Sequence, residues 1–208
     1  NSKTVGNAKT VTATVSIDNA NYSLSNSTAI TTASITPKEI TGAFAAANKV
    51  YDGANAAAVT ERNLQGVIDQ DAVVLIGGTA TFSDKNVGIG KSVTLSGATL
   101  SGLDKDNYLL SSVSDASANI SPKAVSVSPV ASSKVYGAVD PAFSGTTAGF
   151  LEADGIAVSY VRSPGEQVAS YTINGVLSPE DALGNYEITY NTALFEITTA
   201  RLVVIADN

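Results

Sequence analysis

The stretch Ile120–Gly137, ISPKAVSVSPVASSKVYG, repeats an earlier one, Ile35–Gly53, ITPKEITGAFAAANKVYDG. In both copies an Ile lies fourteen residues before the Lys of a Lys-Val-Tyr triplet, which is Lys49 in the first copy and Lys134 in the second. A third copy begins at Ile197. Because a self-similar period is the mark of an array of repeats, this feature limits the fold to small units joined in series.

The composition favours strands over helices. The chain has 208 residues, 44% of them hydrophobic, which allows two ordinary domains with apolar cores. Only 6% are aromatic and none is Trp, so Val, Ile, Leu and Ala must form those cores. Charged residues make up 15%, against roughly 25% in a typical soluble domain. The polar surface is therefore mostly Ser, Thr and Asn, which suits the exposed faces of strands.

Apolar and polar residues alternate at positions 10–17, TVTATVSI, and this period of two predicts a strand with one buried face. No segment has a helical pattern of helical length, although residues 64–74 could hold one helical turn. Short strands with turn signals about every ten residues predict an all-β protein. The expected fold is a series of small immunoglobulin-like β-sandwich repeats in an elongated array. A β-grasp-like arrangement, with residues 64–72 as its helix, is the alternative.

Turn dipeptides divide the repeats into strands. Gly77-Gly78 predicts a break between one strand at 73–76 and another at 79–82. Asn174-Gly175 predicts a further turn in the second repeat.

The repeated stretches predict four segments. Val5–Lys9 matches Val87–Lys91, and Asn21-Tyr22 matches Asn107-Tyr108, so the first segment resembles the end of the repeat that follows it. Such a partial repeat should have unpaired edges, and we expect it to be less ordered or to pair with a neighbour. The chain begins without Met and ends within the pattern, so we expect a piece of a longer protein. The segments are 1–34, the C-terminal part of a preceding repeat; 35–119 and 120–199, the two complete repeats; and 200–208, the first strand of a further repeat.

Charge and composition argue against several functions. The net charge of −7 is a poor match for nucleic acid or an anionic membrane, since both attract clusters of Lys and Arg. No apolar run is long enough for a membrane-spanning helix. The absence of Cys excludes disulfides and thiol catalysis, and the absence of His removes the commonest general base. We therefore expect no enzymatic activity, no nucleic-acid partner and no membrane insertion.

Two sets of motifs resemble known families of bacterial surface proteins. Lys49–Gly53 (KVYDG), Gly78–Gly88 (GTATFSDKNVG) and Asp106–Tyr108 (DNY) resemble the YDG-type repeat. Lys134–Gly137 (KVYG) with the Asp-Pro that follows, and Gly184–Tyr190 (GNYEITY), resemble the MBG domain of YGX type. The signature positions are Tyr51, Asp52, Gly53, Asn107 and Tyr108 in the first repeat and Tyr136, Gly137, Asn185 and Tyr186 in the second.

The resemblance implies a secreted or cell-surface protein of a Gram-negative bacterium, of the filamentous-haemagglutinin or biofilm-adhesin kind. Repeats of this type form part of a long stalk, and their signature positions are structural. The resemblance thus implies a spacer that projects a binding domain, with host or bacterial ligands bound by other parts of the parent protein. An adhesive module that binds glycan, matrix or a second copy is the alternative.

Asp104, Asp106 and Asn107 place hard oxygen donors in one predicted loop, and Ca²⁺ takes ligands of this type. They complete neither an EF-hand nor a glycine-rich calcium repeat, and Asx residues in turns have an ordinary structural role. The prediction is therefore no metal and no cofactor, with these three kept as candidate calcium ligands. Similar pairs of carboxylates occur at Asp69 and Asp71 and at Glu180 and Asp181.

The tyrosines recur at equivalent places. Tyr51 and Tyr136 end the repeated triplet, while Tyr22, Tyr108 and Tyr186 each follow an Asn at a turn exit. An aromatic platform for a ligand is one interpretation. We favour the other, in which these rings belong to the core and their hydroxyls bond to backbone at a corner of the sandwich.

Overall fold

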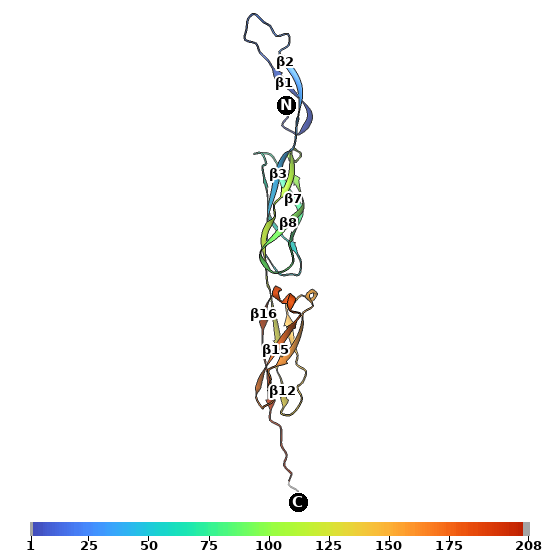
Figure 1. Cartoon of the computed structure of the whole chain (residues 1–208), viewed down its shortest axis with the longest axis vertical. Coiled ribbons are helices and arrows are strands. Elements are labelled where there is room, and N and C mark those ends of the chain that lie inside the picture. Colours follow the sequence, from blue (N-terminus) through green and yellow to red (C-terminus); the bar gives the residue numbers. More distant parts are fainter. Residues whose placement is uncertain (1, 206–208) are drawn as a thin grey trace. The chain divides into compact units, whose positions relative to one another are not determined.

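The computed structural model describes residues 2–205 and is all-β. Its helices within that range are three short 3₁₀ turns, η1 (Lys105–Asn107), η2 (Glu152–Asp154) and η3 (Glu180–Asn185) (Figure 1). The helical turn expected in residues 64–74 is wrong. A strand ends there at Gln65, and the positive φ angles of Gly66 (93°) and Gln70 (72°) are incompatible with a continuing right-handed helix. The helix that the β-grasp alternative places at 64–72 is thus not formed.

The chain divides into two compact units. The first unit comprises residues up to Ala47 together with Ala56–Ser83 and Ser92–Ala118. The second unit comprises Asn48–Asn55, Asp84–Lys91 and the residues from Asn119 onward. Two loops that the sequence assigns to the first repeat therefore lie in the second unit.

The first unit is built on a three-stranded sheet of order β6-β3-β9, a pair β1-β2, and neighbouring strands in the order β8-β7-β5. Residues of β3, β7, β8 and β9 form its core, including Ile40, Phe82 and Val93. The strands are β1 (Gly6–Thr14), β2 (Thr28–Ile35), β3 (Lys38–Ala46), β5 (Ala56–Ala57), β6 (Val59–Gln65), β7 (Val74–Phe82), β8 (Gly88–Ser101), β9 (Tyr108–Val113) and β10 (Ala116–Ser121).

The second unit has a three-stranded sheet of order β13-β11-β16 and a four-stranded sheet of order β12-β17-β15-β14. Ile173, Phe195 and Ile197 form its buried centre. Its remaining short strand, β4 (Lys49–Val50), pairs in parallel with Ile120 and Ser121. The other strands are β11 (Lys123–Pro129), β12 (Ser132–Val135), β13 (Gly145–Ala148), β14 (Ala157–Arg162), β15 (Ser170–Ser178), β16 (Tyr186–Tyr190) and β17 (Ala193–Thr198).

The three-stranded sheets of the two units share one arrangement. The first strand of each repeat, β3 or β11, is central, with an antiparallel neighbour on one side and a parallel neighbour on the other. In both units the residue after the parallel neighbour also bonds to the central strand. The Ser114 amide donates to the Gly42 carbonyl at 2.9 Å, and the Asn191 amide donates to the Val127 carbonyl at 2.9 Å. The prediction of tandem small β domains is confirmed.

The two dipeptides predicted to break or turn the chain, Gly77-Gly78 and Asn174-Gly175, both lie within strands. β7 is continuous from Val74 to Phe82, and Gly77 and Gly78 pass through it with φ angles of 67° and 81°. The expected turn at Asn174-Gly175 is also wrong, since both residues lie within β15. A Cβ atom on Gly175 would lie 2.4 Å from Val127 Cγ1 of β11. Gly175 is therefore required because the two sheets approach each other closely at this point, and not because the chain turns there.

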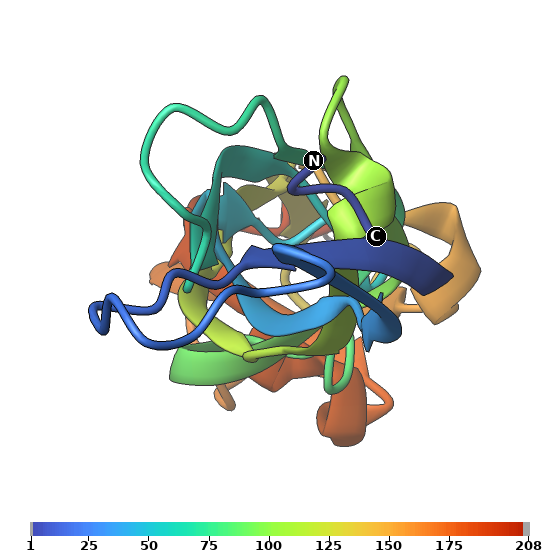
Figure 2. The same cartoon turned by 90° about the horizontal axis from the view of Figure 1, so that it is seen from above.

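The segment at the start of the chain, which the sequence predicts to be part of a repeat, forms the hairpin β1-β2, whose connection Figure 2 shows as a long blue loop. Residues 10–14 of the strand predicted at 10–17 lie in β1, which ends at Thr14, and residues 15–17 are not in a strand. The apolar face is not buried, since Val11 is 42% exposed. Tyr22 lies in the connection and is 69% exposed. The physical reason is that no second sheet covers β1 and β2 within the described residues.

The structure assigns no strand to residues 199–205. The predicted first strand at 200–208 is therefore not formed in the part that is described, and its last three residues lie outside the described range. None of the helices in the described range is long and apolar enough to cross a membrane.

Candidate functional site

Asp154 is the centre of a buried polar cluster in the second unit. Its side chain is 3% exposed. Asp154 lies in η2, at the end of a loop that contains Gly149, whose φ angle of 91° is in the left-handed region. The Tyr51 hydroxyl donates to Asp154 Oδ2 at 2.9 Å, and the Tyr186 hydroxyl donates to the same atom at 2.5 Å. Lys85 Nζ lies 3.3 Å from Oδ1. The carboxylate thus has three donors around it, which offsets the cost of burying its charge.

The pKa values of this cluster follow from burial and from these hydrogen bonds. Burial would raise the pKa of Asp154, but donation from Tyr186, Tyr51 and Lys85 outweighs it, so the pKa lies below its ordinary value. Burial and then the bond to Asp154 raise the pKa of Tyr186 to about 12. The same two causes raise the pKa of Tyr51. The cluster is therefore an ionised carboxylate held by neutral phenols near neutral pH.

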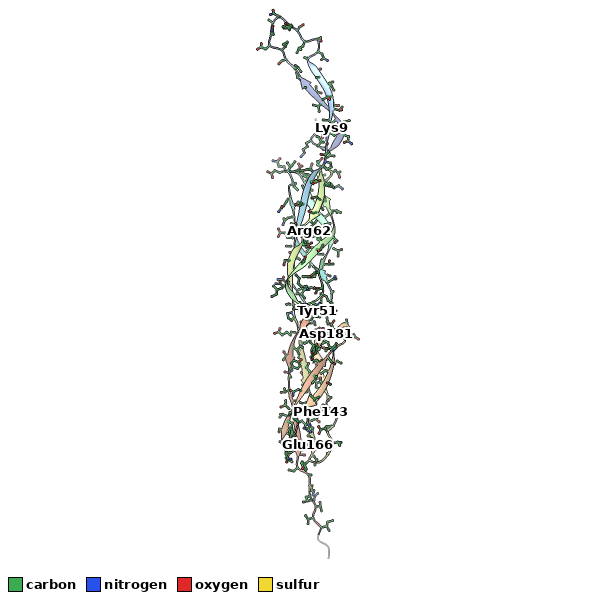
Figure 3. All side chains as sticks on the ribbon, in the orientation of Figure 1. Lys9, Tyr51, Arg62, Phe143, Glu166 and Asp181 are labelled. Carbon is green, nitrogen blue, oxygen red and sulfur yellow. The ribbon has the colours of Figure 1, made fainter. Side chains whose placement is uncertain are left out.

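Asn185 and the two aromatic rings complete the cluster. Asn185 is buried, and its Oδ1 accepts the backbone amide of Val87 at 2.9 Å. The rings of Tyr51 and Tyr186 meet edge to face, with centroids 5.5 Å apart. We call Tyr51, Lys85, Val87, Asp154, Asn185 and Tyr186 the Asp154 cluster. Figure 3 shows Tyr51 at the same end of the second unit as Asp181, with Phe143 and Glu166 toward the other end.

The first unit contains a matching cluster around Asp71. The Tyr108 hydroxyl donates to Asp71 Oδ2 at 2.7 Å, and Lys3 forms an ion pair with the same carboxylate. Asn107 Oδ1 accepts the backbone amide of Val5 at 2.9 Å, as Asn185 accepts that of Val87. We call Lys3, Val5, Asp71, Asn107 and Tyr108 the Asp71 cluster. It has a counterpart for every member of the Asp154 cluster except Tyr51.

The same local backbone builds both clusters. In the first unit Gly66 (φ 93°) precedes Ile68, whose amide donates to the Tyr108 hydroxyl at 3.0 Å. In the second unit Gly149 (φ 91°) precedes Leu151, whose amide donates to the Tyr186 hydroxyl at 3.1 Å. The Asp amide then bonds back to the Ile68 or Leu151 carbonyl at 3.1 Å in each case. One loop design therefore presents a carboxylate to a tyrosine in each repeat.

The YDG positions have structural roles. Tyr51 is 1% exposed, and its amide donates to the Ser121 carbonyl at 2.8 Å. Asp52 Oδ1 accepts Lys49 Nζ at 2.7 Å and the Ala54 amide at 3.0 Å. Gly53 takes a φ of 78°, which favours glycine.

Tyr136 and Gly137 differ from their counterparts in one respect. The Tyr136 amide donates to the Thr198 carbonyl at 2.8 Å, as Tyr51 does to Ser121, and Gly137 has a φ of 82°. The Tyr136 ring, however, is 49% exposed, so the expectation that this tyrosine belongs to the core is wrong. Nothing equivalent to the Asp154 carboxylate lies against it among the described residues.

Two of the three candidate calcium ligands, Asp104 and Asn107, accept hydrogen bonds from the protein itself. Asp104 Oδ2 accepts the Ala72 amide at 2.9 Å, and Asn107 Oδ1 is occupied by the Val5 amide. Asp106 lies in η1. Within residues 2–205 no group of three or more His, Cys, Asp or Glu side chains is placed to hold a metal ion.

A second charged network stabilises the other end of the second unit. Lys134 and Arg162, both nearly buried, share the carboxylates of Asp140 and Glu166. The Arg162 guanidinium also lies 5.1 Å from the centre of the Phe195 ring, a cation–π distance. Every charge in this network has a partner of opposite sign. We therefore assign the network a role in stability.

Sequence reasoning missed Asp154, Lys3 and Lys85 as functional residues. The signals were present, because the spacing Gly-x-(Ile/Leu)-x-x-Asp occurs at 66–71 and again at 149–154. The pattern Lys-x-Val also occurs at 3–5 and at 85–87. For Asp71 the sequence pattern indicates only a pair of carboxylates with Asp69.

Successive units with one strand arrangement and one recurring Asp–Tyr–Asn cluster define a protein of tandem all-β repeat domains. Comparison with known families agrees: the YDG domain matches residues 36–118, and the MBG domain of YGX type matches residues 125–196. The chain carries these two domains in tandem. No curated protein and no solved structure matches it.

Proposed function

We propose that this chain is a structural spacer segment of a secreted or cell-surface bacterial adhesin, in which the repeats hold a binding domain away from the cell. The observation that carries the proposal is the Asp154 cluster. Its signature side chains satisfy one another, and Tyr51 and Asp154 come from segments that match different families. A buried polar cluster whose side chains are hydrogen-bonded to one another serves cohesion better than ligand binding.

The same reasoning supports a role without catalysis. The buried carboxylates of Asp71 and Asp154 are each held by a tyrosine and a lysine. Their pKa values are lowered, so neither is prepared as a general acid or base near neutral pH. We propose an extracellular location and ligand contacts through other parts of the parent protein.

Force spectroscopy on the chain held between inert handles tests the spacer role. A spacer should resist tension and unfold in discrete cooperative steps, and Asp154→Ala should lower the force of one step. A chain that extends without discrete steps would contradict the proposal. Specific binding of the chain to a glycan or matrix protein would instead support the second candidate, an adhesive module, which is favoured by the exposed strand β2.

A further inference from the structure

The first unit contains a cavity of about 140 Å³ beside the Asp71 cluster. Its lining combines apolar side chains with the carboxylate of Asp71, the phenol of Tyr108, the polar Thr36 and Asn107, and the lysines Lys3 and Lys38. An apolar protein cavity of about 150 Å³ can take up benzene, so this volume suits one aromatic ring. A carboxylate in the wall adds a preference for a ring that carries a hydrogen-bond donor.

The residues around this cavity match the residues around Tyr51 in the second unit. Asp71, Tyr108 and Asn107 correspond to Asp154, Tyr186 and Asn185 by the hydrogen bonds described above. The corresponding position in the second unit is occupied by the Tyr51 ring, which is edge to face with Tyr186 and bonded to Asp154. The cavity thus lies where a tyrosine equivalent to Tyr51 would lie.

The strand edge beside the cavity also corresponds to the strand edge that pairs with β4 in the second unit. In the second unit β4 pairs in parallel with Ile120 and Ser121, and the Ser121 hydroxyl donates to the Lys49 carbonyl at 3.3 Å. Ile35, the last residue of β2, and Thr36, which follows it, correspond in the repeated sequence to Ile120 and Ser121. Both line the cavity, and Thr36 carries a hydroxyl as Ser121 does. Within the described residues β2 pairs only with β1. The edge that β4 would occupy is therefore open.

Tyr136 shows what the carboxylate contributes. Its strand makes the same backbone bond, and the Thr198 hydroxyl donates to the Lys134 carbonyl at 3.2 Å, as Ser121 does to Lys49. Yet Tyr136 is 49% exposed while Tyr51 is 1% exposed. Both tyrosines thus have the strand pairing, whereas only Tyr51 has the contacts to the Asp154 carboxylate and the Tyr186 ring.

We propose that the cavity of the first unit and the open edge of β2 form a binding site for an extended Lys-Val-Tyr strand, supplied by the front part of another repeat of this type. The strand pairs in parallel with Ile35 and Thr36, and its tyrosine enters the cavity and donates to Asp71. Main-chain pairing supplies affinity, and the phenol pocket supplies specificity. The proposal depends on the geometry of the first unit and not on the spacer role.

A peptide with the sequence of residues 46–53, AANKVYDG, tests the site when it is added to the full chain and followed by NMR. Amide shifts are expected at Ile35, Thr36, Ile68 and Tyr108. A peptide with Phe in place of Tyr should bind roughly tenfold more weakly, because it lacks the hydrogen bond to a charged acceptor. A peptide methylated on the tyrosine nitrogen should lose binding to a similar degree, since it cannot pair with the Thr36 carbonyl.

The variant Asp71→Asn should also weaken binding of the tyrosine peptide, and less so that of the Phe peptide. Asp154→Asn is the matched control, because it alters the other cluster and should leave the affinity unchanged. Unshifted β3 and β7 amides will show that the first unit is folded in each variant. The proposal is overturned if millimolar peptide shifts no amides, if it shifts only residues away from the cavity, or if the Phe and Tyr peptides bind equally.

Discussion

The hydroxyl of Tyr51 donates to Asp154 Oδ2 at 2.9 Å although 103 residues separate the two in the chain. Tyr51 lies in the segment matched by the YDG domain and Asp154 in the segment matched by the MBG domain. The bond thus joins the signature residue of one repeat to a loop of the next. It also explains why a tyrosine is needed at this position, since a phenylalanine would leave a buried carboxylate with one donor fewer.

Replacing Tyr51 by Phe should lower the free energy of unfolding by about 1.5–3 kcal/mol, because a hydrogen bond to a charged acceptor is lost at a buried site. Urea unfolding followed by circular dichroism measures the change. Tyr136→Phe is the matched control and should change stability by less than about 0.5 kcal/mol, since its ring is half exposed. Equal losses in both variants would contradict the assigned role.

Replacing Asp154 by Ala should lower the free energy of unfolding by about 2–3 kcal/mol, because Tyr51 and Tyr186 lose their shared acceptor. The loss is limited because Lys85 is half exposed and can be hydrated. Asp181→Ala, at an exposed position of η3, serves as the control and should be nearly neutral. A neutral Asp154→Ala variant would show that the cluster does not stabilise the unit.

Stability should fall at high pH through Tyr186. Its pKa is raised from 10.0 to about 12 in the folded protein. The folded state therefore holds this proton more tightly than the unfolded chain does, so the contribution is complete below pH 10 and is lost as the pH rises toward 12. Unfolding measured across this range should show a smaller fall for Tyr186→Phe. An identical slope in both proteins would refute the assignment.

Stability should also fall in acid through Asp140. Hydrogen bonds from Arg162 and Lys134 lower its pKa from 3.8 to about 2. The folded state releases this proton more readily than the unfolded chain, so the contribution is present above pH 3.8 and is lost as the pH falls toward 2. Thermal unfolding over this range should be less acid-sensitive for Asp140→Asn. Added salt should reduce the difference, because the network is partly exposed to solvent.

Replacing Gly175 by Ala should destabilise the second unit by about 1–3 kcal/mol, since the new Cβ would lie 2.4 Å from Val127 Cγ1. Gly184→Ala meets no atom within 4 Å and is the control. Adding Val127→Ala to Gly175→Ala should cost less than the sum of the single changes, because the smaller side chain makes room. Strict additivity would show that the two sheets do not meet at this point.

The sequence predicted where strands occur better than it predicted whether a strand continues through a glycine. The period-two pattern of residues 10–17 predicted a strand, and β1 includes residues 10–14 of it. The turn dipeptides failed at Gly77-Gly78 and at Asn174-Gly175, where glycine lies inside a strand. At Gly175 the reason is a neighbour in the other sheet, Val127, which no local pattern contains.

The repeat itself was determined by the sequence, because self-similar positions such as Tyr51 and Tyr136 are visible without coordinates. Only the tertiary structure decided that these two tyrosines differ, one buried and one half exposed. The physical reason is that burial of a phenol depends on a distant acceptor, and Asp154 reaches Tyr51 through a loop of another repeat. Local pattern therefore fixes which residues recur, while the fold decides which of them find a partner.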